Sequence, residues 1–174
     1  MRRYPGAEFT RAELVRCDAM LRPATPADRD ALVALAQHPE IAATLATTAA
    51  ESLREDTGEL LVIEHEHQLV GGVRWVLVNR RSRIADIRTL MIDPAHGGRG
   101  LATQAIKQLA RHLVADHDIH RVEAEVYGFN TAAQRVFANA GFTEEGRRRQ
   151  AYDRAGAWQD GVRYGLLAEE LAAV

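Results

Sequence analysis

The clearest pattern of apolar and polar positions in this chain is a strict alternation over residues 121–127. Apolar side chains fall on one face of an extended segment and polar side chains on the other. The apolar set is Val122, Ala124 and Val126, and the polar set is Glu123, Glu125 and Tyr127. A period of two residues is typical of a strand with one buried face. We therefore predict a strand over Arg121–Tyr127.

Three apolar segments that come earlier in the chain predict consecutive strands. The first contains Leu60–Ile63, the second covers Leu69–Val78 and the third covers Arg83–Ile92. A polar turn at Glu66-His67-Gln68 separates the first two, so the three are expected to form an antiparallel meander. Within the second segment, Gly71-Gly72 indicates a bulge or a close approach of two backbones.

Apolar residues at helical spacing predict a helix over Leu101–Ala115 and a shorter one over Asn130–Ala140, which Gly141 ends. A helix is also expected to begin at Thr25-Pro26-Ala27-Asp28, where a cap, a proline and an acid stand in helix-start order. Pro39 breaks that helix, and a second short helix is predicted over Glu40–Thr47.

The two ends of the domain complete the predicted sheet. A first strand is expected at Ala19–Arg22, and a closing hairpin at Phe142–Arg149 and Trp158–Leu167, around the turn Asp153–Gly156. This mixture of strands and helices predicts an α+β domain whose sheet is covered by helices. Residues 1–18 are predicted to be an N-terminal extension with a short helix, because Thr10-Arg-Ala-Glu13 has capping-box spacing. Residues 19–174 then form one domain.

Composition narrows the classes of partner. The chain has 174 residues and a formal net charge of −2, which argues against a protein whose main role is to hold nucleic acid. The lone Cys17 suits a reducing compartment, no apolar run reaches the length of a membrane helix, and the first residues do not resemble a signal peptide. We therefore expect a cytoplasmic protein with no nucleic-acid or membrane partner.

The glycine-rich turn between the third strand and the long helix carries the most chemical information. It reads Asp93-Pro-Ala-His-Gly97-Gly98-Arg99-Gly100 and leads directly into a helix. Glycines in such a turn let backbone N–H groups approach an anion, and the start of the helix adds partial positive charge. A Walker loop is excluded because the turn has no lysine, and a Rossmann fingerprint fails because Thr103 stands where glycine or alanine is needed.

The segment Gly97-Gly-Arg-Gly100-Leu-Ala102 resembles the acyl-CoA pyrophosphate loop of GNAT N-acetyltransferases, with Gly97 where the family usually has Arg or Gln. The helix that begins Asn130-Thr-Ala-Ala-Gln-Arg-Val-Phe137 and ends at Gly141-Phe142 resembles a second family motif, with Phe137 where many members carry Tyr. The opening Leu21–Thr25, the run Glu144–Tyr152 and the later Trp158–Asp160 and Tyr164–Leu167 are similar to the RimJ/RimL-type branch. The resemblance covers roughly residues 20–170.

The resemblance implies a GNAT fold, with a mixed, mostly antiparallel central sheet of six to seven strands flanked by helices. It implies direct transfer of an acetyl group from acetyl-CoA, as co-substrate, to a primary amine. The co-substrate would be held by the third strand, the glycine-rich turn and the following helices. The residues implied are Leu90, Met91, Ile92, Gly97, Gly98, Arg99, Gly100, Leu101, Ala102, Thr103, Asn130, Arg135 and Phe137.

An amine must lose a proton before it can attack a thioester, and a carboxylate can take that proton. Glu125 is the first candidate base, because it lies on the polar face of its strand and five residues before Asn130, where some N-terminal acetyltransferases of the family have a catalytic Glu. Asp86 is the second, since it interrupts an apolar strand. Each carboxylate has the alternative of a plain ion pair, for Asp86 with Arg83 or Arg88.

The proton donor for the leaving thiolate is less well defined by the sequence. Phe137 has no hydroxyl, so Tyr127 or Tyr152 would have to replace the usual tyrosine, unless the thiolate leaves unassisted. The alternative to an enzyme is a catalytically weak acyl-CoA-binding sensor or regulatory module, and Phe137 is the residue that supports it.

The acceptor amine is either a protein N-terminus, as the RimJ/RimL resemblance implies, or a small molecule such as an antibiotic or polyamine. Its surface is expected to come from residues 26–57 and 150–158, and the protein to be a monomer or homodimer. No metal is expected: His65 and His67 share a strand face in this interpretation, but no third ligand accompanies them. His112 and His117 are expected at the surface of a helix end.

Overall fold

The protein was analysed as a computed structural model, which describes residues 19–46, 49–54 and 58–171. The predicted helix at residues 10–13 and the predicted N-terminal extension therefore lie outside the described residues. Within the described part, no helix is long and apolar enough to cross a membrane.

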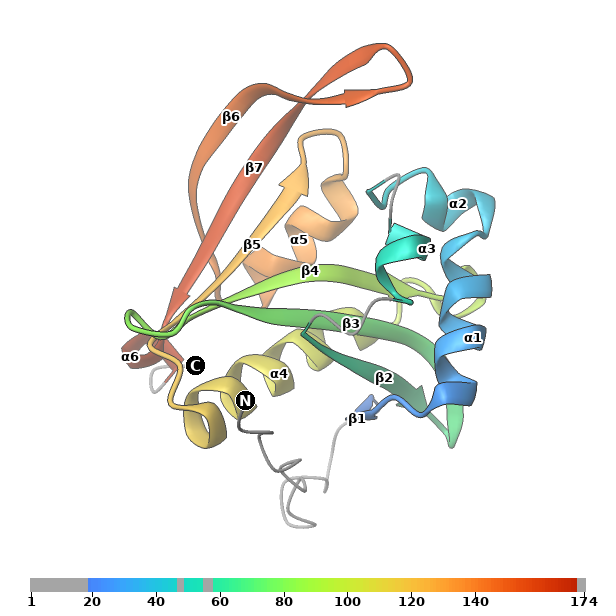
Figure 1. Cartoon of the computed structure of the whole chain (residues 1–174), viewed down its shortest axis with the longest axis horizontal. Helices are drawn as coiled ribbons and strands as arrows, with labels where there is room; N and C mark the ends of the chain where they lie inside the picture. The colour runs from blue at the N-terminus through green and yellow to red at the C-terminus, as the bar shows by residue number, and fades with distance from the viewer. Residues whose placement is uncertain (1–18, 47–48, 55–57, 172–174) are drawn as a thin grey trace.

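A seven-stranded sheet in the order β1-β2-β3-β4-β5-β7-β6 forms the centre of the structure (Figure 1). Its strands are β1 (Met20–Pro23), β2 (Glu59–His65), β3 (Gln68–Asn79), β4 (Ile84–Ile92), β5 (Arg121–Tyr127), β6 (Thr143–Arg154) and β7 (Ala157–Leu167). All neighbours pair antiparallel except β4 and β5, which are parallel. The predicted fold class, meander and closing hairpin are confirmed.

Helices cover both faces of the sheet. They are α1 (Pro26–Ala36), α2 (Pro39–Ala42), α3 (Ala49–Ser52), α4 (Leu101–His117), α5 (Thr131–Asn139) and α6 (Ala168–Leu171), with a 3-10 turn at Pro94–His96. On one face α1 and α2 bury Leu32 and Ile41 against Val62 and Met91. On the other face, α4 and α5 contribute to the larger core, which includes Leu109 and Phe137.

The alternation predicted for β5 is what divides its residues between these faces. Val122, Ala124 and Val126 are buried in the larger core, whereas Glu123, Glu125 and Tyr127 are only partly buried. The side of β5 that faces away from α4 and α5 therefore carries polar and charged groups, and this side provides the chemistry described below.

Gly71 marks a close approach of two backbones, as predicted from the Gly71-Gly72 pair. A Cβ at Gly71 would collide with the carbonyl oxygen of Met91 on β4. A register shift lies nearby on β2, between Ile63 and Glu64. Only glycine therefore allows β3 to lie this close to β4 at that point.

Several boundaries differ from those predicted. Helix α2 ends at Ala42, and the carbonyl of Ile41 accepts hydrogen bonds from the backbone N–H groups of Thr44 and Leu45 in the turn that follows. Strand β6 continues to Arg154, because Tyr152 and Asp153 pair with Gln159 and Trp158 across the hairpin. The short helices α3 and α6 were not predicted.

Two predictions about histidines are wrong. His67 does not share a strand face with His65, because β2 ends at His65 and the next two residues form a turn with positive φ. His112 is buried rather than at the surface, since it lies on the apolar face of α4. Its Nδ1 lies 2.8 Å from Asp116, and its Nε2 lies 3.1 Å from His117.

The start of α1 forms the predicted cap and connects it to β1. The Thr25 side chain accepts from the backbone N–H of Asp28, and the Asp28 carboxylate accepts from the backbone N–H of Thr25. Asp28 also forms a two-point ion pair with Arg22, at 2.6 Å and 3.0 Å. These contacts hold the pKa of the Asp28 carboxyl well below its usual range, with the Arg22 hydrogen bond as the largest cause.

We predict that Asp28→Asn lowers the free energy of unfolding by about 1–2 kcal/mol at neutral pH, because it weakens both the cap and the ion pair. The folded protein lowers this pKa, so the contribution is complete above the ordinary aspartate pKa of about 4 and is lost as pH falls below it. Urea unfolding at neutral and acidic pH measures the difference. Asp30→Asn, at an exposed position of the same helix, is the matched control; an equal loss at both pH values would contradict the prediction.

Candidate active site

The parallel strands β4 and β5 separate in the middle of the sheet. Their pairing runs from Ile84 opposite Arg121 to Ile87 opposite Ala124 and then stops, although all residues of both strands are described. Beyond this point β4 continues beside β3, and β5 continues beside β7. An extra residue in β4 shifts the register opposite Arg74 and Trp75 and accommodates Arg88.

A cavity of about 480 Å³ lies where the two strands separate. Its walls come from the segment after α2, from β3, β4, β5, β6 and from α5. The lining residues are Thr44, Leu45, Ala46, Arg74, Asp86, Ile87, Arg88, Thr89, Leu90, Glu125, Val126, Tyr127, Asn130, Ala133, Phe137 and Tyr152. The cavity thus unites both predicted carboxylates and Tyr127 with three of the predicted co-substrate residues, Leu90, Asn130 and Phe137.

Asp86 lies in the wall of the cavity on β4, and its side chain is largely buried. Burial raises the pKa of the Asp86 carboxyl, and the nearby Arg88 opposes this shift only in part. Its Oδ2 accepts a hydrogen bond from Arg88 Nε at 3.1 Å, whereas Oδ1 has no hydrogen bond within the described residues. The ion pair predicted as an alternative for Asp86 is therefore present, with Arg88 rather than Arg83.

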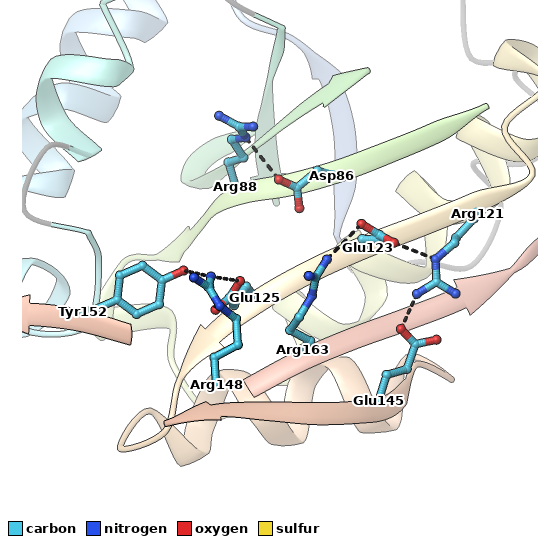
Figure 2. Close-up of polar contacts among 9 residues, drawn as sticks. All are labelled: Asp86, Arg88, Arg121, Glu123, Glu125, Glu145, Arg148, Tyr152 and Arg163. Atoms are coloured by element: carbon cyan, nitrogen blue, oxygen red, sulfur yellow. Dashed lines mark hydrogen bonds and ion pairs between the residues drawn. The ribbon is translucent and has the colours of Figure 1, made fainter. Parts of the chain in front are cut away.

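Glu125 is held by two residues of β6 (Figure 2). Both of its carboxylate oxygens lie 3.0 Å from Arg148 Nη1, and the same nitrogen lies 3.3 Å from the Tyr152 hydroxyl. The carboxylate occupies space over Gly161 on β7, where a Cβ would collide with Glu125 Oε1. Burial and the hydrogen bond with Glu125 raise the pKa of Tyr152, so this hydroxyl stays protonated at neutral pH.

A second group of charges continues along the same face of the sheet, outside the cavity lining (Figure 2). Glu123 accepts from Arg121 at 2.7 Å and from Arg163 at 3.3 Å. Arg121 also pairs with Glu145 on β6. These pairs join β5, β6 and β7. Glu123 does not line the cavity, but it lies opposite Asp86 in the strand register and its charge helps to raise the Asp86 pKa.

The glycine-rich turn leads into α4 in the conformation expected of an anion cradle. Gly98 and Gly100 have φ values of 74° and 76°, and a Cβ at either would point into open space. Gly100 is the N-cap of α4 and supplies no side-chain cap, so the first N–H groups of this helix remain available to an anion. Arg99 is exposed beside them, and Gly97 is extended.

The predicted co-substrate residues outside the glycine-rich turn that do not line the cavity differ in how deeply they are buried. Met91 and Leu101 are buried in the core, so only their backbones are available to a ligand. Ile92, Ala102 and Thr103 are partly buried, and Arg135 is exposed. None of these six residues lines the cavity.

Phe137 has a packing role in addition to its place in the cavity wall. Its ring is buried, stacks on Tyr164 with centroids 5.8 Å apart, and meets Phe142 edge-on at 5.2 Å. This environment explains a phenyl ring at the position without reference to catalysis. Asn130 caps α5 by accepting from the backbone N–H of Ala133 at 3.1 Å.

Two arginines near the cavity were not identified from the sequence. Arg74 is buried in the lining, and Arg154 reaches across from the β6–β7 hairpin to the segment after α2. No local pattern distinguishes them, since Lys107 is the only lysine and arginine supplies every other basic side chain. In the described part of the chain, no group of three or more His, Cys, Asp or Glu residues is placed to hold a metal ion.

Comparison with known proteins supports the sequence resemblance. Among curated relatives, the SPbeta prophage-derived N-acetyltransferase YokL of Bacillus subtilis is 26% identical over 120 residues, which cover 69% of this chain and 67% of YokL. The spermidine N(1)-acetyltransferase of Vibrio cholerae is 26% identical over 107 residues, covering 62% of this chain and 61% of that protein. The chain thus spans about two thirds or less of these relatives.

Solved structures share the fold over a larger part of the chain. The spermidine N-acetyltransferase of Vibrio cholerae, crystallised with CoA and spermine, superposes with a TM-score of 0.76 at 22% identity and covers 89% of this chain and 98% of that one. Residues 18–143 match the model of the acetyltransferase (GNAT) domain family. The chain therefore belongs to the GNAT acetyltransferase family, and the predicted class, an acetyl-CoA-dependent N-acetyltransferase, is confirmed.

Proposed function

We propose that this protein acetylates the primary amine of a small molecule in the cavity between β4 and β5. The observation that carries the proposal is the position of two carboxylates, Asp86 and Glu125, in one cavity at the point where the strands separate. The spermidine acetyltransferase of Vibrio cholerae, similar in sequence and fold, acts on a small amine and supports this choice. A protein N-terminus, which the RimJ/RimL-type resemblance implies, is the alternative acceptor.

In this proposal acetyl-CoA is held on the side of α4 and α5. The open N–H groups at the start of α4, with Gly98, Arg99 and Gly100, would bind its pyrophosphate. Leu90 and Asn130 would line the path of the thioester into the cavity. Beyond Ile87 the β4 backbone keeps its pairing with β3 but not with β5, so an N–H group on the β5 side could stabilise the negative charge that gathers on the attacked carbonyl.

The amine would enter from the charged side of the sheet. An ammonium has no lone pair, so one proton must pass to a base before nitrogen attacks the acetyl carbon and the C–S bond breaks. We propose Asp86 as this base, because its raised pKa brings it closer to neutral pH and its Oδ1 is open to a new hydrogen bond. This order reverses the one predicted from the sequence.

Glu125 would orient the amine, and Asp86 rather than Glu125 would take its proton. Both of its oxygens are engaged by Arg148, so it must exchange one hydrogen bond to receive a proton. The leaving thiolate needs little help if its pKa is near 8.5. Tyr127 remains the candidate donor for its proton, and Tyr152, hydrogen-bonded to Glu125, is the other tyrosine in the lining.

The test of the proposed function is release of free thiol from acetyl-CoA with a panel of amines. We expect turnover with at least one small primary amine. Turnover only with peptide N-termini would support the alternative acceptor, and tight CoA binding with no turnover on any amine would overturn the proposal. The alternative of a catalytically weak acyl-CoA sensor depended on Phe137. The packing of its ring against Phe142 and Tyr164 accounts for a phenylalanine at this position and does not support that alternative.

We predict that Asp86→Asn lowers kcat by about 100-fold at neutral pH, the usual scale for loss of a general base. Because burial raises the pKa of Asp86, activity of the unaltered enzyme falls with decreasing pH through a value above the ordinary aspartate pKa of about 3.9. The pH profile of kcat at saturating acetyl-CoA should lose this acid limb in the variant.

Glu125→Gln should lower kcat/KM for the amine while it keeps the acid limb. Glu123→Gln is the comparison variant, since Glu123 lies on the same face of β5 but pairs with Arg121 and Arg163 and does not line the cavity. It should leave kcat/KM for the amine unchanged and move the acid limb to lower pH, because the Glu123 charge helps to raise the pKa of Asp86. Unchanged kcat across the pH range in both Asp86→Asn and Glu125→Gln would remove the carboxylate-base proposal.

We also predict that Gly100→Ala raises KM for acetyl-CoA by about tenfold, with a smaller effect on KM for the amine. The φ of 76° is unfavourable for alanine, so the turn must shift and weaken a hydrogen bond to a charged group, typically worth about 1.5–3 kcal/mol. Steady-state kinetics measures both constants. Gly146→Ala, also at positive φ with open space around the new methyl group, is the control and should leave KM for acetyl-CoA unchanged.

A further inference from the structure

Arg154 ties the tip of the β6–β7 hairpin to the segment after α2. Its Nη1 donates to the carbonyl of Leu45 and its Nη2 to the carbonyl of Ala42, both at 2.5 Å. The hairpin turn next to it is fixed by a hydrogen bond from the N–H of Gly156 to Asp153 at 2.8 Å. Figure 1 shows the hairpin leaning toward α2 above the end of β5.

The guanidinium of Arg154 also lies over two stacked aromatic rings. Its central carbon is 5.2 Å from the centroid of Tyr127 and 5.5 Å from that of Phe129. The two rings are 5.2 Å apart and nearly parallel, at 11°. These cation–π contacts and the two carbonyl bonds hold the charged group in one position.

That position adjoins the cavity. Arg154 is not among the residues that line it, but Leu45 and Tyr127, which it contacts, both are. The guanidinium therefore lies next to this part of the wall. An acceptor whose far end extends past Leu45 and Tyr127 would come next to it.

In the part of the chain that the structure describes, no carboxylate forms an ion pair with Arg154. Within the described residues its contacts are with carbonyl oxygens and aromatic rings, which are neutral groups. The two carboxylates of the cavity are already paired, Asp86 with Arg88 and Glu125 with Arg148. A second ammonium on the acceptor would meet an unneutralised cation here, whereas an anionic group would be attracted.

We infer that the acceptor is an amine that also carries an anionic group, such as a carboxylate, and that Arg154 is the residue that selects it. This inference rests on the proposed function and gives its substrate a class. It also distinguishes this chain from the spermidine acetyltransferases of similar fold, whose named substrate is a polycation. Arg154 acts here through substrate binding and takes no part in proton transfer.

The experiment compares three probes of equal chain length that end in different charges: aminocaproate with a carboxylate, hexylamine with a methyl group, and cadaverine with a second ammonium. Dissociation constants are measured by titration calorimetry with the full chain saturated with CoA. We expect aminocaproate to bind tightest and cadaverine weakest, with about a fivefold change at each step, the scale of a partly exposed ion pair. High salt should reduce the differences between the three dissociation constants, because it screens the charges.

Arg154→Met keeps the length of the side chain and removes its charge, so the three constants should converge. Arg154→Lys keeps the charge but cannot span both carbonyls, and should retain the order with smaller steps. Arg147→Met removes an equal charge from the same strand, where Arg147 pairs with Asp160, and should leave the order unchanged. Thermal unfolding of each variant identifies any loss of folded protein.

Absence of aminocaproate binding, a reversed order in the unaltered protein, or an order that survives in Arg154→Met would each overturn the inference. These outcomes are distinct from failure of the proposed function, which is the absence of thiol release with every amine in the panel. Binding in the expected order together with thiol release from amines that carry a carboxylate would support both.

Discussion

The separation of β4 from β5 is the constraint on which the site depends. Each strand is held by a different antiparallel neighbour, β3 for β4 and β7 for β5, so neither can follow the other beyond Ile87 and Ala124. The backbone groups facing the gap then lack strand partners, and such groups are costly to leave unpaired. A ligand that itself carries amides, as acetyl-CoA does, can take the place of the missing strand. The cavity is thus a property of strand register rather than of loops.

The two sides of this gap differ in chemistry because apolar and polar residues alternate along β5. One side meets α4 and α5 through apolar residues and leads to the glycine-rich turn. The other side carries Glu125, Tyr127 and, from β4, Asp86. A single strand pattern therefore separates the region suited to the phosphates and thioester from the region suited to the amine. The carboxylates of the second region, Asp86 and Glu125, are paired with arginines, and this pairing reduces the attraction of the region for a cationic acceptor.

Local sequence patterns predicted most of the fold. The alternation of β5 was predicted with both its boundaries, and the cap at Thr25, the turn before α4 and the helix ended by Gly141 were placed correctly because each depends on a few neighbouring residues. The far end of β6 was missed, since Gln150–Arg154 shows no regular alternation of apolar and polar residues and pairs only because β7 lies opposite.

The site could be predicted in its parts but not in its contacts. Asp86 and Glu125 were predicted because Asp86 interrupts an apolar strand and Glu125 lies on the polar face of β5, five residues before Asn130. Arg88 was one of two partners predicted for Asp86, whereas the pairing of Glu125 with Arg148 depends on the approach of β6, which no local pattern reports. Arg154 shows more clearly why contacts could not be predicted from local patterns, because its carbonyl partners lie about a hundred residues earlier in the chain. Burial of His112 was missed for the same reason, since it follows from the packing of α4.

Strand β6 is the last strand of the sheet, and one of its backbone edges therefore has no strand beside it. Exposed edges of this kind can pair with the same edge of another molecule and start aggregation. The edge here carries three consecutive arginines, Arg147–Arg149, which are all exposed. Two copies that met along β6 with Arg148 opposite Arg148 would bring these like charges together across the new strand pair, which is unfavourable. The arginines of β6 thus disfavour that register of edge pairing, while Arg148 also holds Glu125 in the cavity.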